Sequence, residues 1–274
     1  MAGATVNNSP LPASRTCNVA GGQLQYWDVG SGRPIVFIHG VGTSGDLWMA
    51  DLSELAHSCR VIVHNRRGYG GSSASPRDWS AHASDALQLL RTLEATPAVL
   101  VGYSGGAIVA LDIAVRHPQD VSHLVLVDPA YSLHKCLTPG LLGTMVLVKL
   151  SMLLGGRRAA VERWLRYVSS YATGGNAYDD KASDERKEAL AANADGVLAD
   201  LASGSGKVPE SRVAQLPMPV TIISAALSPS FLRNSSQRLR RLLPQARAIT
   251  LPQSGHWIGL DAGPELTRLL GDLR

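Results

Sequence analysis

The chain has 274 residues, of which 45% are hydrophobic, and its formal net charge is +4. This length suits one large globular domain or one domain with an insertion, and the mild charge does not indicate a nucleic-acid partner. The cysteines at positions 17, 59 and 136 lack metal-ligand spacing, which predicts free thiols in a cytoplasmic protein. Residues 1–16 have no apolar core of a signal peptide and are expected to form a flexible arm.

The first half of the chain alternates short apolar runs with segments of helical periodicity. A hairpin is predicted over residues 18–29, with Gly21 and Gly22 at its turn. The elements expected after it are strands at 34–38, 60–64, 99–103 and 121–127, and helices at 47–56, 79–93 and 107–117. This alternation predicts an α/β protein with a doubly wound, mostly parallel sheet of about eight strands and helices on both faces.

The alternation stops after Asp128 and resumes near residue 213. Residues 131–212 show no convincing strand and are expected to form a helical cap inserted after the sixth strand, with the clearest helices at 157–171 and 184–201. The apolar stretch 137–154 contains Pro139 and Lys149 and is too short for a span, so a buried or pocket-lining helix is expected rather than a membrane helix. Strands at 219–225 and 246–251 and helices at 233–243 and 260–273 then complete a core made of residues 17–130 and 213–274.

The sequence Gly102-Tyr103-Ser104-Gly105-Gly106 lies between a buried strand and a helix. This is the pattern of a nucleophile elbow, in which a tight turn lifts the serine hydroxyl above the start of the helix. Glycines two residues before and after the serine leave room for that turn. We therefore predict that Ser104 is a nucleophile and that the N–H of Gly105 is an oxyanion donor.

A serine hydroxyl needs a base within hydrogen-bond reach. The loop after the final predicted strand carries His256, at the edge of the sheet where the elbow also lies. The loop after the strand at 34–38 reads His39-Gly40-Val41-Gly42, and the N–H of Val41 is the expected second oxyanion donor. His39 itself is expected to hold this loop by hydrogen bonds.

These motifs, together with Arg67-Gly68-Tyr69-Gly70 and Leu126-Val127-Asp128-Pro129, resemble the serine-hydrolase branch of the α/β-hydrolase superfamily over residues 24–273. The resemblance implies a third triad member, an acid usually found in the loop after the strand at 219–225. No Asp or Glu occurs between Ser211 and His256, and Ser228 stands near the usual position.

Some members of the superfamily carry the acid one strand earlier, which matches Asp128 here. Because Asp-Pro at this strand end also occurs in relatives that have the usual acid, two hypotheses stay open. Either Asp128 orients His256, or the site is a Ser–His dyad with a less well oriented imidazole. A second departure from the family is Asn65, where relatives often have aspartate, and it is expected to alter packing near the site.

The sequence favours a serine hydrolase that cleaves a carboxylic ester, lactone or thioester of a hydrophobic small molecule. The alternatives are a lyase, a cofactor-free oxygenase or an acyl-transfer cyclase that uses His256 as base, and a catalytically silent binding protein. No cofactor, metal, nucleic-acid partner or membrane span is expected, and the oligomeric state is left open. The residues expected to contact the substrate are Gly40, Tyr103, Trp257, Leu142 and Met145.

Overall fold

The structure is a computed structural model that describes residues 12–204, 206 and 208–273. Its centre is an eight-stranded sheet in the order β1-β2-β4-β3-β5-β6-β7-β8. The strands are β1 (Arg15–Val19), β2 (Gly22–Val29), β3 (Pro34–Ile38), β4 (Arg60–His64), β5 (Ala98–Tyr103), β6 (Val121–Val127), β7 (Val220–Ala225) and β8 (Arg247–Leu251). Strands β1 and β2 are antiparallel to their neighbours and the others are parallel, which confirms the predicted α/β fold class.

Helices cover both faces of the sheet because alternate strand side chains bury apolar surface on each side. On one face lie α1 (Gly45–Leu52), the 3₁₀ turn η1 (Ser53–His57) and α10 (Ile258–Gly271). On the other face lie α2 (Trp79–Thr92), α3 (Gly106–Arg116), the short α8 (Glu210–Val213) and α9 (Ser230–Leu242). A further 3₁₀ turn, η2 (Pro118–Asp120), leads into β6.

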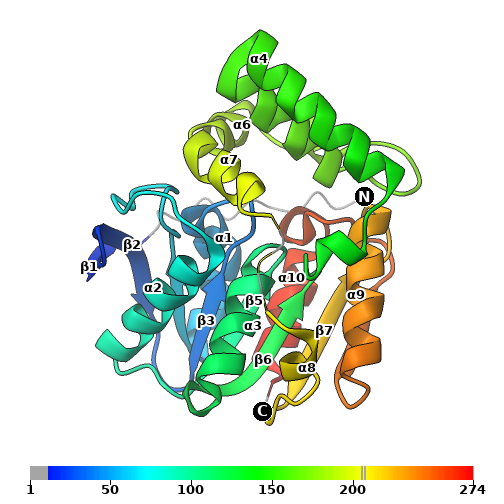
Figure 1. Cartoon of the computed structure of the whole chain (residues 1–274). Coiled ribbons are helices and arrows are strands. Elements are labelled where there is room, and N and C mark those ends of the chain that lie inside the picture. Colours follow the sequence, from blue (N-terminus) through cyan, green and yellow to red (C-terminus); the bar gives the residue numbers. More distant parts are fainter. Residues whose placement is uncertain (1–11, 205, 207, 274) are drawn as a thin grey trace.

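The chain between β6 and β7 is helical, as expected, and is called the helical insertion below (residues 131–212). Its elements are η3 (Leu133–Lys135), α4 (Pro139–Val168), α5 (Ala177–Asp180), α6 (Asp184–Ala191), α7 (Ala194–Ala202) and α8. Figure 1 shows α4, α6 and α7 above one edge of the sheet, away from the α8 end.

The switch point of the sheet lies between β3 and β5, which are adjacent although β4 comes between them in the chain. From β3 the chain moves to β4 on one side, and from β5 it moves to β6 on the other side. In open parallel sheets, the loops that leave such a point diverge and form a crevice at the carboxyl ends of the strands. Residues 39–42 and the elbow at Ser104 are the two loops that leave this point.

Several element boundaries differ from the predictions. Residues 1–11 of the expected arm lie outside the described residues, and Arg15 and Thr16 belong to β1, where they pair with β2. The helix predicted over 184–201 is two helices, α6 and α7, separated around Asn193. The helix predicted from residue 157 is the second half of α4, which changes direction at Gly156 where φ is +76°.

The apolar part of α4 is more exposed than predicted. Within the described part of the chain, α4 is the one helix that is long and apolar enough to cross a membrane, and only 17% of its most apolar window is buried. Leu141 and Val148 face inward, whereas Leu153 and Leu154 are 81% and 88% exposed. Of the expected buried or pocket-lining helix, the outer side is therefore exposed, while Leu141 and Met145 on its inner side line a cavity and pack against the rest of the insertion.

Candidate active site

Ser104 occupies a strained turn between β5 and α3. Its φ is +52°, in the left-handed region that non-glycine residues seldom adopt. The flanking glycines are required by space: a Cβ on Gly102 would lie 2.7 Å from the Cα of Ala107, and one on Gly106 would lie 2.1 Å from the carbonyl oxygen of Ile38. The sequence motif therefore folds into the predicted strand, turn and helix.

His256 lies beside Ser104 although 152 positions separate them in the chain. The Oγ hydroxyl of Ser104 is 3.0 Å from Nε2 of His256, at hydrogen-bonding distance. Tyr103 supports the histidine, because its ring stacks on the imidazole and its hydroxyl donates to the carbonyl oxygen of His256 over 2.6 Å. The loop after β8 thus presents His256 to the elbow.

Asp128, at the end of β6, is the carboxylate that contacts the other side of the imidazole. Its Oδ2 accepts a hydrogen bond from Nδ1 of His256 over 2.6 Å. The same carboxylate accepts from the Ser228 hydroxyl over 2.6 Å and from the N–H of Ala225 over 3.2 Å. Ser228 therefore stands beside the carboxylate, and these bonds fix the proton of His256 on Nδ1, leaving Nε2 to accept from Ser104.

The two expected oxyanion donors lie next to each other. Val41 and Gly105 line the same cavity as Ser104, and a Cβ on Gly105 would come within 2.9 Å of a methyl group of Val41. His39 fixes the neighbouring backbone: its Nδ1 donates to the carbonyl oxygen of Gly40 over 2.9 Å, and its Nε2 accepts from the N–H of Arg66 over 2.9 Å. His39 thus makes the loop hydrogen bonds that the sequence predicts.

The side chain of Asn65 makes two hydrogen bonds between the loop after β4 and its surroundings. Its Oδ1 accepts from the N–H of Gly45 over 2.6 Å, and its amide nitrogen donates to Oε1 of Gln25 over 2.7 Å. An aspartate at position 65 could not donate, so asparagine suits the packing between β2 and the start of α1.

A buried ion pair between Arg66 and Asp200 was not predicted. The guanidinium donates to both carboxylate oxygens, over 2.7 and 3.3 Å, and also to the carbonyl oxygens of His39 and Gly40. Tyr69 and His82 complete the shell of Asp200 at 2.6 and 3.0 Å. Burial of Asp200 alone would raise the pKa of its carboxyl group, but the positive charge of Arg66 outweighs this effect and holds that pKa far below the usual range. The pair ties α7 of the insertion to the loop after β3.

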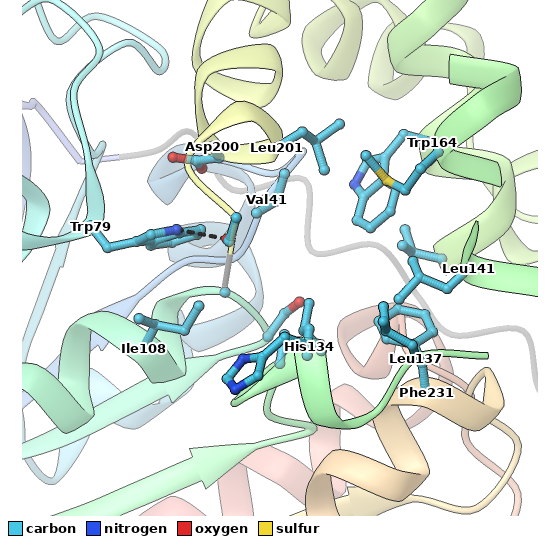
Figure 2. Close-up of a pocket in the computed structure, with 17 residues that line it drawn as sticks. Val41, Trp79, Ile108, His134, Leu137, Leu141, Trp164, Asp200, Leu201 and Phe231 are labelled. Atoms are coloured by element: carbon cyan, nitrogen blue, oxygen red, sulfur yellow. Dashed lines mark hydrogen bonds between the residues drawn. The ribbon is translucent and has the colours of Figure 1, made fainter. Parts of the chain in front are cut away.

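The cavity above Ser104 has a volume of about 250 Å³, below the roughly 300–1,000 Å³ of pockets for drug-sized ligands. Its lining is mainly apolar and comes from the sheet loops, the insertion and α9, as Figure 2 shows. The lining residues are Val41, Trp79, Ser104, Gly105, Ile108, Ala130, Leu133, His134, Leu137, Leu141, Met145, Trp164, Val168, Asp200, Leu201, Gly204 and Phe231.

Of the five residues expected to contact the substrate, Met145 lines this cavity and the others do not. Leu142 points away from it on the outer side of α4 and is half exposed. Tyr103 and Trp257 line a separate pocket of about 30 Å³. Gly40 packs against Ser104, since a Cβ there would lie 2.7 Å from the serine Cβ. Leu142 was misplaced because α4 has apolar residues on more than one side, and its packing against the rest of the protein decides which side faces the cavity.

Across residues 12–204, 206 and 208–273, no three His, Cys, Asp or Glu side chains are grouped so that they could hold a metal ion.

Three buried histidines near the site predict a steep loss of stability in acid. Burial, assisted by the charge of Arg66, lowers the pKa of His39 and His82 and brings that of His64 to about 3. The native state therefore binds fewer protons at these sites than the unfolded chain does below about pH 6.5. We expect the free energy of unfolding to fall as the pH drops below that value, by up to about 4 kcal/mol per pH unit, the limit for three protons taken up on unfolding.

Urea unfolding between pH 7.5 and 5 measures this slope. His64→Gln removes one buried histidine and should reduce the slope by about a third. The exposed His57 provides the matched control, and His57→Gln should leave the slope unchanged. Equal urea midpoints at pH 7 and pH 5 in the unaltered protein would contradict the expectation.

Comparison with known proteins extends these observations. A model of the alpha/beta hydrolase family matches residues 35–268. The 2-hydroxymuconate semialdehyde hydrolase of Pseudomonas sp. (strain CF600) is 38% identical over 133 residues, which are 45% of each chain. The non-heme chloroperoxidase of Streptomyces lividans is 39% identical over 106 residues, which are 37% of this chain and 38% of that protein. The matched segments thus span less than half the length of these curated relatives.

Solved structures match over nearly the whole chain. The structure of Est816, described as an N-acyl homoserine lactone degrading enzyme, has a TM-score of 0.77 and 20% identity, covering 95% of this chain and 100% of that one. Esterase RhEst1 from Rhodococcus sp. ECU1013 has a TM-score of 0.75 and 20% identity, covering 94% and 96%. At these identities the likeness concerns the fold. With the family model matching most of its length, this chain belongs to the alpha/beta hydrolase family.

Proposed function

We propose that the chain is a serine hydrolase that cleaves a carboxylic ester, lactone or thioester of a small apolar molecule. The observation that carries the proposal is the hydrogen-bonded series Ser104, His256 and Asp128, with contacts of 3.0 and 2.6 Å. Nucleophile, base and orienting acid in such a series are the recurring machinery of acyl transfer. The names of relatives and structural neighbours as hydrolases and esterases agree with this chemistry.

In the proposed mechanism, Ser104 Oγ attacks the carbonyl carbon while His256 Nε2 takes the hydroxyl proton. Asp128 stabilises the resulting imidazolium, and the N–H groups of Val41 and Gly105 bind the negative oxygen. The imidazolium then gives its proton to the departing alcohol or thiol, which leaves an acyl group on Ser104. A water molecule, deprotonated by Nε2, attacks the acyl carbon, and the acid departs as Ser104 regains its proton.

The helical insertion acts in this proposal as a cap over the cavity. Support comes from α4 and α7, which contribute Leu141, Met145, Trp164 and Leu201 to its lining. Such a cover excludes water and selects an apolar substrate. We also propose a cytoplasmic location, supported by Cys17, Cys59 and Cys136, which are buried and unpaired.

Labelling with a fluorophosphonate, which reacts with activated serines, tests the proposal. We expect the folded protein to be labelled, Ser104→Ala to be unlabelled, and His256→Ala to be labelled far more slowly because the base is lost. Ser132 is the matched control: it is also buried with a positive φ of 53°, but its hydroxyl donates to Glu210. Ser132→Ala should keep full labelling.

The same proteins are assayed on nitrophenyl esters of short and medium acyl chains. Hydrolysis that disappears in Ser104→Ala supports the proposal. A folded protein that is neither labelled nor active on any ester would overturn it. That outcome would favour a lyase or a cofactor-free oxygenase in which His256 acts as base.

A further inference from the structure

Trp164 carries a polar group into the apolar cavity. It lies on α4, its side chain is only 6% exposed, and it lines the cavity above Ser104. Its indole nitrogen is buried and has no hydrogen-bond partner among the described residues. Figure 2 shows Trp164 across the cavity from Trp79.

Trp79 provides the contrast within the same cavity. Its indole N–H donates to the carbonyl oxygen of Gly204 over 2.9 Å, the bond drawn as a dashed line in Figure 2. An indole N–H can only donate, and a buried donor without an acceptor is costly. Most buried polar groups in native proteins are hydrogen-bonded, so an unpaired one calls for a specific explanation.

The side-chain acceptors nearest the reaction centre are already in use. The hydroxyl of Ser104 bonds to His256, and the carboxylate of Asp200 accepts from Arg66, Tyr69 and His82. A molecule that fills the cavity can bring its own acceptor to Trp164. The N–H is therefore placed as a fixed donor for something that enters from outside.

The charge of the cavity narrows the chemistry of that acceptor. Among the described residues, the lining contains no lysine or arginine, and its one carboxylate, Asp200, is neutralised by Arg66. His134 is the described lining side chain, apart from the catalytic centre, that could take up a positive charge. A carboxylate on the substrate would therefore meet no permanently charged partner among these residues, which makes its burial unfavourable. A neutral oxygen, in a ketone, ether, hydroxyl or second ester, meets the N–H without that cost.

We propose that Trp164 recognises a neutral oxygen acceptor on the substrate, separate from the carbonyl group that Ser104 attacks. The preferred substrates are then uncharged esters or lactones that carry a second oxygen in an otherwise apolar skeleton. This inference rests on the proposed function, because it assumes that the cavity binds the molecule being cleaved.

Matched pairs of esters test the inference. In each pair one methylene group is replaced by an ether oxygen, as in ethyl pentanoate and ethyl 3-methoxypropanoate, and the oxygen is moved stepwise along the acyl and alkoxy chains. Acid release measures kcat/KM for each ester. Trp164→Phe keeps most of the ring and removes the N–H. Trp79→Phe, which removes an N–H that is already bonded to protein, is the matched control.

We expect at least one oxygen position to raise kcat/KM about 10-fold or more over its methylene partner. Trp164→Phe should abolish that preference, so that kcat/KM for the oxygen ester falls to about the value for its methylene partner in the same variant. Trp79→Phe should alter both members of the pair alike and so preserve the ratio. A preference that survives in Trp164→Phe, or the lack of any preference at every oxygen position, would overturn the inference.

A second measurement serves if Trp164→Phe does not fold. The indole N–H resonances of ¹⁵N-labelled Ser104→Ala are recorded with each ester, which this variant should bind without cleaving. The Trp164 resonance should move downfield with the preferred oxygen ester and not with its methylene partner. Failure of the proposed function is distinguishable, because it would appear as absent labelling and absent hydrolysis of every ester.

Discussion

We expect Asp128→Asn to lower kcat about 10⁴-fold in a protein that remains folded. The cause is the direction of the fixed donors around residue 128. The N–H of Ala225 points at one carboxylate oxygen, so the carbonyl oxygen of an asparagine would turn toward it. The amide group of the asparagine would then donate to Nδ1 of His256, and the imidazole proton would move to Nε2. A protonated Nε2 cannot accept the proton of Ser104.

Measurement of kcat on the best ester, with circular dichroism to verify folding, checks this prediction. Ser228→Ala is the control, because it removes one donor to Asp128 and leaves the histidine contact in place. It should cost far less than Asp128→Asn, about 10-fold or less. Full activity in Asp128→Asn would mean that Ser104 and His256 act as a dyad.

A compensating variant sharpens this result. Ser228 lies 2.6 Å from the carboxylate of Asp128, near the position where the family usually has its acid. Adding Ser228→Asp to Asp128→Asn returns a carboxylate to this side of His256. We expect kcat to recover in part. No recovery would show that a carboxylate in the loop after β7 cannot replace the one at the end of β6.

Asp200→Leu should destabilise the protein by about 3–5 kcal/mol. The change leaves the guanidinium of Arg66 buried with its charge uncompensated, which is among the costliest substitutions in a core. Arg66 also holds the carbonyl oxygens of His39 and Gly40, so the loop beside Ser104 should loosen and kcat should fall as well. Urea unfolding and ester hydrolysis measure the two effects.

Two further variants separate charge from packing. Arg66→Met combined with Asp200→Leu removes both charges, and it should be more stable than Asp200→Leu alone. Asp195 is the matched control on the same helix, because its ion pair with Arg157 is exposed. Asp195→Leu should have little effect on stability. If Asp200→Leu and Asp195→Leu were equally mild, the buried pair would have no special role.

The sequence was sufficient for the fold because strands such as β3 and β5 are short apolar runs bounded by loops. It was also sufficient to single out Ser104, His256 and Asp128, since each follows a strand whose carboxyl end reaches the same edge of the sheet. The contact of Asp128 with His256 required coordinates, because an Asp-Pro at that position is compatible with two roles.

Other features had no local signal. Arg66 and Asp200 are 134 positions apart, and neither belongs to a spaced motif that would pair them. The choice between Leu142 and Met145 depended on the rotation of α4 about its own axis, which apolar composition does not determine. Nothing in the sequence distinguished Trp164 from the other apolar residues of the insertion, since the hydrogen-bond partner of an indole N–H cannot be deduced from the chain alone.

The position of Asp128 at the end of β6 has a consequence for the order in which this protein is assembled. Strands β5 and β6 are neighbours joined through α3, so Ser104 and Asp128 belong to one local βαβ unit. Such a unit has short-range contacts and can form while later parts of the chain are still being synthesised. His256 follows only after the whole insertion, β7 and β8. In the proposed mechanism, the nascent chain therefore has no base beside Ser104 until synthesis has passed residue 256.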